Sequence, residues 1–407
     1  MTVKELRKQF PGLEREVYGK PLIYLDNAAT SQRCLGAIEA QSDSAVHHNG
    51  NTHRSVYALA AEATRAYEGA RERVAGFIGA SSPEEIVFTS GTTSSINLVA
   101  SSFGGKFIGP GDEIIVAESE HHSDIIPWQL LAERKGAKIV VLPVEDSGKL
   151  RVEALKGLIN KQTKLVCVAQ ISNVLGLVNP LSEIISVAHS AGVPVLVDGA
   201  QGVVHQKVSV KDLDCDFYAF SGHKMYAATG IGVLYAKKSI LEQMPPYMGG
   251  GEMIGDVSWE ESTYADIPYK FEAGTPNINS VPTFVPAIDL LEDIWTSETA
   301  LEISEIKKYV YEALSSDDRI VLRGTTEILE EKVPLFSFSV KGVHHEDLAL
   351  ILDKMGIAVR SGHMCAQPLM KRFGVTGMIR ASFAPYNTLE EAKTFIKSLN
   401  KAIELLQ

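Results

Sequence analysis

The stretch Asp216-Phe217-Tyr218-Ala219-Phe220-Ser221-Gly222-His223-Lys224 is the most informative part of this chain. An apolar run, typical of a buried strand, ends here in a hydroxyl, an imidazole and an amine on one short turn. A second apolar run, Val195-Leu196-Val197, ends in Asp198. If the two runs are neighbouring strands, Asp198 and Lys224 can approach opposite edges of one flat ring. The pattern therefore predicts an acid and an amine that face the same ligand.

Pyridoxal 5'-phosphate (PLP) requires this pair of groups. A lysine holds its aldehyde as a Schiff base, and an acid faces its pyridine nitrogen. Ser221 and His223 are suitably placed to hold its phosphate. Gln201 could hydrogen-bond its phenolic oxygen, or it could be a turn residue. The sequence thus predicts a PLP site built on Lys224 and Asp198.

Short β-rich runs alternate with helical stretches between residues 85 and 240. They lie at 85–88, 113–116, 138–142, 165–168, 194–197, 217–220 and 231–235. This alternation predicts an α/β fold whose mostly parallel sheet has seven strands and is covered by helices on both faces. Ligands bind beyond the carboxyl ends of such strands, where the candidate residues lie.

The rest of the chain predicts a smaller α+β domain. A helical pattern is expected from about 285 to 314, strands at 335–340 and 378–383, and a helix at 345–355. A capping box, Thr388 with Glu391, begins an amphipathic last helix. We expect residues 1–20 to pack with the small domain, 21–284 to form the large PLP-binding domain, and 285–407 to form the small domain that carries Cys365.

Composition narrows the possible functions. The 407 residues are 45% hydrophobic and 22% charged, and no apolar run is long enough for a membrane helix. A net charge of −11 disfavours nucleic-acid binding. The four cysteines form no CxxC pair, which disfavours a disulfide scaffold or a zinc ribbon. We expect a cytoplasmic protein with free thiols.

Hydroxyl-bearing residues crowd a predicted helix start at Thr89-Ser90-Gly91-Thr92-Thr93-Ser94-Ser95. Free N–H groups at a helix N-terminus attract phosphate, and the hydroxyls of Thr92 and Thr93 can add to them. An ordinary Ser/Thr N-cap is the alternative. His121 and His122 follow another strand; adjacent histidines point in different directions, so a shared metal is disfavoured. One imidazole could instead stack on a cofactor ring.

Three further groups are candidates for binding substrate or for reacting with it. Arg380 lies within a small or apolar strand, so its guanidinium needs an anion, either a substrate carboxylate or an internal ion-pair partner. Asn173 follows a strand and could be a turn residue. Cys365 lies in a segment bounded by Gly and Pro that predicts an exposed loop, where His363 or Arg360 could favour the thiolate.

Taken together, these motifs resemble the PLP-dependent cysteine desulfurases of the SufS/CsdA type (group II), members of the class V aminotransferase family with fold type I. The matching segments are Tyr24–Thr30, Asp214–Tyr226, Gly249–Ile254, Phe271–Pro276 and Arg360–Cys365. The resemblance implies Lys224 as the Schiff-base lysine, His121 stacked on the ring, and Cys365 as the nucleophile that accepts sulfur. The other implied site residues are Asp198, Gln201, Thr92, Thr93, Ser221 and His223 for the cofactor, Thr275 from the other subunit of a homodimer, and Asn173, Arg380, Arg360 and Asn27 for the substrate.

The same resemblance implies the reaction and its partners. L-cysteine would become L-alanine, and its sulfur would pass as a persulfide on Cys365 to an acceptor protein, commonly of iron–sulfur cluster assembly. Four positions depart from the usual pattern: Ala227-Ala228 replaces Gly-Pro, Ser94 replaces an acidic residue, and Asp124 replaces Asn. Selenocysteine lyase is the nearest alternative; an aminotransferase or epimerase and a non-catalytic scaffold are more distant ones.

Overall fold

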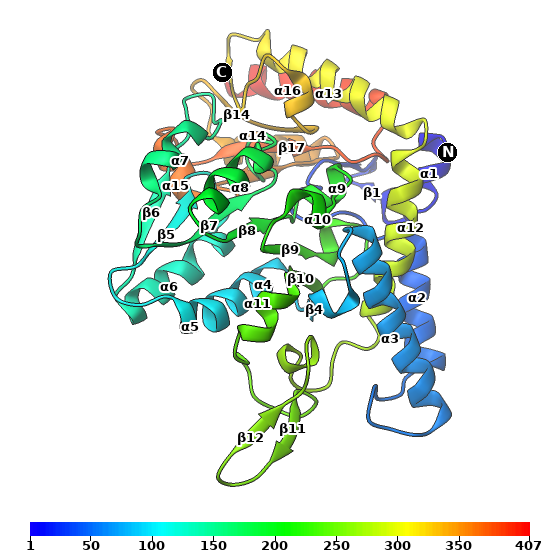
Figure 1. Cartoon of the computed structure of the whole chain (residues 1–407). Coiled ribbons are helices and arrows are strands. Elements are labelled where there is room, and N and C mark those ends of the chain that lie inside the picture. The colour runs from blue at the N-terminus through cyan, green and yellow to red at the C-terminus, as the bar shows by residue number, and fades with distance from the viewer.

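The computed structural model describes all 407 residues, and a seven-stranded sheet lies at its centre (Figure 1). The strand order is β4-β10-β9-β8-β7-β5-β6. β10 runs antiparallel to both of its neighbours, and the other adjacent pairs are parallel. The seven predicted strands are confirmed, with the bounds β4 (Ile86–Thr89), β5 (Glu113–Ala117), β6 (Lys138–Leu142), β7 (Thr163–Ala169), β8 (Val195–Asp198), β9 (Phe217–Ser221) and β10 (Gly232–Ala236).

Helices cover both faces of this sheet because the central strands are apolar on both sides. Within β7, Leu165 and Cys167 join one buried cluster, whereas Val166 and Val168 join another. The first cluster includes residues of α4 (Thr92–Val99), α6 (Ile126–Lys135) and α11 (Lys238–Gln243). The second includes residues of α7 (Val152–Leu158) and α8 (Leu181–Ser190). The prediction of an α/β fold with helices on both faces is confirmed.

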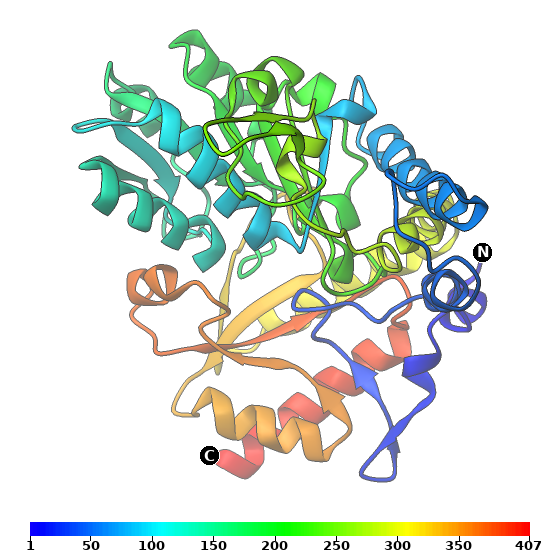
Figure 2. The same cartoon turned by 90° about the horizontal axis from the view of Figure 1, so that it is seen from below.

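A second sheet, β13-β14-β17-β16, is antiparallel and belongs to the C-terminal part of the chain (Figure 2). Its strands are β13 (Ile320–Arg323), β14 (Leu335–Val340), β16 (Arg360–Gly362) and β17 (Met378–Ser382). The helices α13 (Thr299–Ser315), α14 (His345–Lys354) and α16 (Leu389–Leu406) share its hydrophobic core. The predicted capping box at the start of α16 is present.

Residues 23–25 pack with this second unit, whereas Leu6, Phe10 and Leu13 join the buried cluster of the large sheet. β3 (Ile23–Tyr24) pairs in parallel with β15 (Ile357–Ala358), and Leu25 packs in the same core as α16. The helix predicted at 285–314 is in fact two helices, α12 (Phe284–Trp295) and α13, separated at residues 296–298. The two helices also pack in different places: α12 contributes to the core of the large sheet, and α13 contributes to the core of the small sheet. The division into three parts at residues 20 and 284 stays a prediction.

A two-stranded hairpin, β11 (Ile254–Val257) with β12 (Ser262–Tyr264), projects from the body of the molecule (Figure 1). Sequence patterns did not predict it, and its residues are mostly exposed. None of the helices combines the length and the apolar character that crossing a bilayer would need.

Candidate active site

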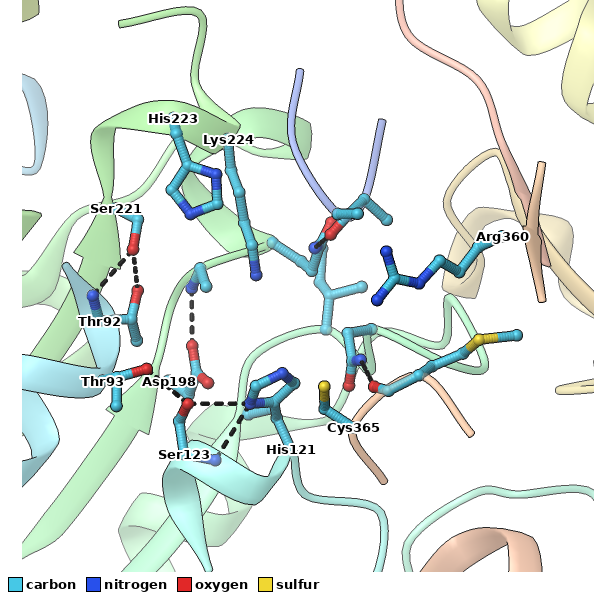
Figure 3. Close-up of a pocket in the computed structure, with 18 of the residues that line it drawn as sticks. Thr92, Thr93, His121, Ser123, Asp198, Ser221, His223, Lys224, Arg360 and Cys365 are labelled. Atoms are coloured by element: carbon cyan, nitrogen blue, oxygen red, sulfur yellow. Dashed lines mark hydrogen bonds between the residues drawn. The ribbon is translucent and has the colours of Figure 1, made fainter. Parts of the chain in front are cut away.

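A cavity of about 270 Å³ opens beyond the carboxyl ends of β7, β8 and β9, where the sequence predicted a ligand. Residues from both sheets line it, so it lies where the two parts of the chain meet. Lys224, His121 and Cys365 point into the same space (Figure 3). The lining contains most of the predicted site residues, namely Thr92, Thr93, His121, Asn173, Asp198, Gln201, Ser221, His223, Lys224, Arg360, Cys365 and Arg380.

Asp198 and Lys224 form the electrostatic centre of this cavity. Asp198 ends β8, is 7% exposed, and accepts the backbone N–H of Ala200 at 2.8 Å. Burial raises the pKa of Asp198, whereas the nearby ammonium of Lys224 acts in the opposite direction. Burial lowers the pKa of Lys224, and no hydrogen bond contributes to that pKa. A lysine with a lowered pKa is closer to the neutral, nucleophilic amine that condenses with an aldehyde.

His121 turns into the cavity at the start of a short 3₁₀ turn, His122–Asp124. Its Nδ1 accepts the backbone N–H of Ser123 at 3.0 Å, so the neutral ring carries its proton on Nε2. Burial, followed by the charge of Lys224, lowers the pKa of His121 to about 3. His121 is therefore a neutral imidazole near pH 7, which suits a ring that stacks on another ring.

Ser123 is a site residue that sequence reasoning missed. Its hydroxyl lies 3.0 Å from Nδ1 of His121 and 2.6 Å from Oγ1 of Thr93 (Figure 3). It thus joins the turn that carries His121 to the first turn of α4. The only signal in the sequence is a hydroxyl two residues after His121, which is too common to single out.

The N-terminus of α4 has the features of a phosphate cradle. Its N-cap is Gly91, which has no side chain, so the alternative of an ordinary Ser/Thr N-cap is wrong. The N–H of Thr92 donates to Oγ of Ser221 at 2.8 Å, which joins the two polar turns (Figure 3). Gly91 has φ 149° and is crowded: a Cβ on the adjacent Gly232 would lie 2.4 Å from its Cα. Backbone N–H groups at an uncapped helix start remain available to an anion.

Cys365 is half-buried and lies between β16 and α15 (Gln367–Arg372). The predicted exposed loop is correct only in part, because residues 360–362 form β16. The segment is also fixed by contacts: the carbonyl of Cys365 accepts the N–H of His122 at 2.7 Å, and its N–H donates to Nδ1 of His363 at 3.2 Å. Met364 and Cys365 have φ of 50° and 55°, a left-handed conformation that non-glycine residues rarely adopt. The thiol is therefore held in one position rather than on a long mobile loop.

The other three cysteines, Cys34, Cys167 and Cys215, are buried and unpaired, as structural cysteines would be. His122, the neighbour of His121, points away from it and toward the cysteine segment, where its Nε2 accepts the N–H of Gln367 at 3.1 Å. The expectation that the two histidines point in different directions is met.

Arg380 is 2% exposed and lies in the centre of β17. It donates to Oδ1 of Asp26 at 3.0 Å and to the carbonyl of Asn173 at 2.9 Å, while its Nε has no partner. Arg360 lies 3.8 Å from the other oxygen of Asp26. The internal ion pair and the substrate role are therefore compatible, because both guanidinium groups also line the cavity. Asp26, which orients both, was not singled out from the sequence.

Side chains of the small domain hold three consecutive carbonyls of the turn after β7. Arg380 donates to Asn173, Ser337 donates to Val174, and Lys332 donates to Leu175. Lys332 is 1% exposed, and burial lowers its pKa to about 7. The amide of Asn173 in turn donates to the carbonyl of Met364 at 2.9 Å. This carbonyl clamp, residues 173–175 with their three donors, connects the large sheet to the cysteine segment.

Two predicted residues are not brought to the cavity. Asn27 is buried beside it but donates to the carbonyl of Ser382 at 2.7 Å and accepts the hydroxyl of Tyr386, so its amide is used within the fold. The substrate role expected for Asn27 stays a prediction, and in this structure its amide is hydrogen-bonded within the fold. Thr275 is exposed and lies away from the cavity within one chain. Gln201 does line the cavity, and its Nε2 donates to the carbonyl of Ala28 at 2.9 Å.

The residues present fit PLP. An amine without a hydrogen-bonding partner, a carboxylate on a neighbouring strand, a neutral imidazole and an uncapped helix start surround one cavity. Arg380 and Arg360 line the same cavity and supply guanidinium groups that suit the carboxylate of an amino acid.

Comparison with known proteins agrees with this geometry. The family described as aminotransferase class-V matches residues 23–395. A protein named probable cysteine desulfurase from Vibrio cholerae is 44% identical over 100% of both chains. Another of the same name, from Halalkalibacterium halodurans, is 48% identical over 99% of this chain and 98% of the other. The crystal structure of the cysteine desulfurase CsdA from Escherichia coli superimposes with a TM-score of 0.90 at 40% identity over 100% of both chains. The apo cysteine desulfurase from Thermococcus onnurineus gives a TM-score of 0.90 at 38% identity, covering 97% of this chain and 98% of the other. The chain belongs to the class-V aminotransferase family, in its cysteine desulfurase branch.

Proposed function

We propose that this protein is a PLP-dependent cysteine desulfurase, a sulfurtransferase that converts L-cysteine to L-alanine and carries the sulfur as a persulfide on Cys365. The observation that carries this proposal is that Lys224, Arg380 and Cys365 line one cavity. A class-V aminotransferase that only moved amino groups would have no use for a thiol fixed at this position.

When bound, PLP supplies an electron sink that weakens the bonds at the α-carbon of the substrate. Lys224 would hold the cofactor and then move the α-proton, since its lowered pKa favours the neutral amine. Asp198 would face the pyridine nitrogen and stabilise positive charge there. Ser221, His223 and the start of α4 would bind the phosphate.

The remaining groups act on the substrate. Arg380, with Arg360 beside it, would bind the carboxylate of L-cysteine and so turn its sulfur toward Cys365. The Cys365 thiolate would attack that sulfur, forming the S–S bond of the persulfide as the substrate's C–S bond breaks. The electron pair of that bond stays with the carbon fragment, which is released as alanine after protonation. His121, with its proton on Nε2, is placed to assist the proton transfers.

We further infer a cytoplasmic homodimer that passes its sulfur to an acceptor protein of iron–sulfur cluster assembly. Dimerisation is supported by the exposed apolar residues Val56 and Tyr57, which are 104% and 51% exposed. In such a dimer, Thr275 of the second subunit would complete the phosphate site. The four free cysteines are consistent with a reducing compartment.

The test is absorbance of the purified protein before and after addition of L-cysteine, with alanine and sulfide assayed together. We expect a visible cofactor band that changes on addition of cysteine, and equal amounts of alanine and transferred sulfur. Cys365→Ala should retain the band but form no persulfide, and Cys365→Ser, which keeps the size and polarity of the side chain, should behave in the same way. A colourless protein, or desulfuration of cysteine by both variants at the wild-type rate, would contradict the proposal.

A further inference from the structure

Two carboxyl groups that the proposed reaction does not use are buried behind the active site. Glu120 and Asp124 flank His121 in the turn between β5 and α6, and both are 0% exposed. Each side chain affects the pKa of the other through a mutual hydrogen bond, and no cation is among the main causes of either shift in pKa. Two ionised carboxylates in such a place would repel each other without compensation.

The hydrogen bonds of the pair leave one oxygen free on each side. Oε1 of Glu120 accepts the backbone N–H of Ala169 at 2.9 Å, and Oδ1 of Asp124 accepts Nε1–H of Trp128 at 2.8 Å. Oε2 of Glu120 and Oδ2 of Asp124 have no partner. Since a carboxylate oxygen cannot donate, one proton held by the pair would supply the donor that the two buried carboxyl groups lack.

We propose that Glu120 and Asp124 share one proton and thereby act as a positioning pair that holds the turn carrying His121. The pair closes the turn across positions 120 and 124, so His121 is fixed against the cavity from behind. With this proton the pair carries one negative charge; without it, the two ends of the turn would repel each other. The role rests on the proposed function only in that His121 faces the cofactor.

The surroundings of the pair favour the shared proton. The other titratable groups that act on it are Asp198, from β8, and Cys167, from β7, and neither is a cation. From α6, the indole N–H of Trp128 donates to Asp124. Burial together with these acidic neighbours raises the pKa of both carboxyl groups well above the ordinary range. The pair is therefore expected to lose its proton at a higher pH than an ordinary carboxyl group does.

Infrared spectroscopy of the purified holoenzyme tests the shared proton directly. We expect the carbonyl band of a protonated carboxylic acid at neutral pH, lost in both Asp124→Asn and Glu120→Gln. Each amide supplies a permanent N–H donor in place of the proton and keeps one negative charge, so both variants should fold. Absence of the band in the wild type, or its persistence in both variants, would overturn the proposal. The wild-type spectrum still decides if a variant fails to fold.

Circular dichroism of the bound cofactor tests the positioning role. In the wild type, the visible signal should fall as pH rises and the pair loses its proton, whereas in Asp124→Asn it should persist to higher pH. Identical pH courses in the two proteins would show that the pair does not position His121. This result would leave the desulfurase proposal unaffected, because that proposal is tested by alanine and sulfur formation.

Discussion

Replacement of Arg380 separates its two possible roles, that of a structural ion-pair partner and that of the residue that binds the substrate carboxylate. The guanidinium makes two hydrogen bonds within the fold, and the Arg380 side chain also lines the cavity. A hydrogen bond to a charged group contributes about 1.5–3 kcal/mol. If Arg380 binds the carboxylate, Arg380→Lys should therefore lower kcat/KM for L-cysteine about 10- to 150-fold. Most of the loss should be in KM, because the carboxylate is bound throughout the reaction.

Lysine is the appropriate replacement because it keeps the positive charge near Asp26 but loses the planar fork that can bind several oxygens at once. Arg380→Ala would also leave Asp26 without its closest cation and would cost stability, since breaking a buried ion pair costs about 3–5 kcal/mol. Asp26 is 19% exposed, which places the expected loss at the lower end of this range.

The assay is steady-state formation of alanine as a function of L-cysteine concentration, combined with thermal unfolding of each variant. Arg360→Lys provides a matched control, because Arg360 lies farther from Asp26, at 3.8 Å, and its side chain is 47% exposed. Its effect on KM should be smaller than that of Arg380→Lys. An unchanged KM in Arg380→Lys, accompanied only by a lower melting temperature, would refute the substrate role.

Three other perturbations test separate parts of the structure. Ser123→Ala removes the hydroxyl that lies between His121 and Thr93. PLP affinity measured by dialysis should fall about 2- to 12-fold, which corresponds to the loss of one neutral hydrogen bond. An unchanged affinity would argue against a role of Ser123 in positioning His121 and Thr93. The folded-state pKa of His121, about 3, lies below its unfolded value of about 6.5, so the unfolded state binds this proton first as pH falls. Stability present above pH 6.5 is therefore lost on acidification, by up to about 1.4 kcal/mol per pH unit, and His121→Gln should lose less between pH 7 and 4 in urea unfolding; parallel curves would contradict this. Arg71, 1% exposed, donates to Glu272 at 2.7 and 3.0 Å, so Arg71→Ala should lower the free energy of unfolding by about 3–5 kcal/mol, and a loss below about 1 kcal/mol would show that the pair is weakly coupled to folding.

Much of the large sheet could be predicted because strands buried on both faces are continuous apolar runs, as at Val195–Asp198. The polar residues that end these strands, such as Asp198 and Lys224, could be assigned to one cavity because parallel strands place their carboxyl ends together. Periodicity carried no such information about the break between α12 and α13, where residues 296–298 are ordinary polar residues rather than Gly or Pro.

Contacts between distant segments could not be predicted from local patterns. Asp26 meets Arg380 across 354 positions, and Ser123 meets Thr93 across 30. Asn27 was assigned to the substrate because of its neighbours in the sequence. In the structure its amide donates a hydrogen bond to the carbonyl of Ser382, a residue of β17 that is distant in the sequence. Which polar side chain faces a cavity and which one is consumed by the fold depends on tertiary packing.

The carbonyl clamp constrains how this enzyme can move. The peptide oxygens of residues 173–175 accept hydrogen bonds from side chains of the C-terminal part of the chain. A hinge motion that separated the two parts of the subunit would have to break these three hydrogen bonds. An amino acid must then reach the reaction chamber through an existing entrance rather than by the lobes swinging apart.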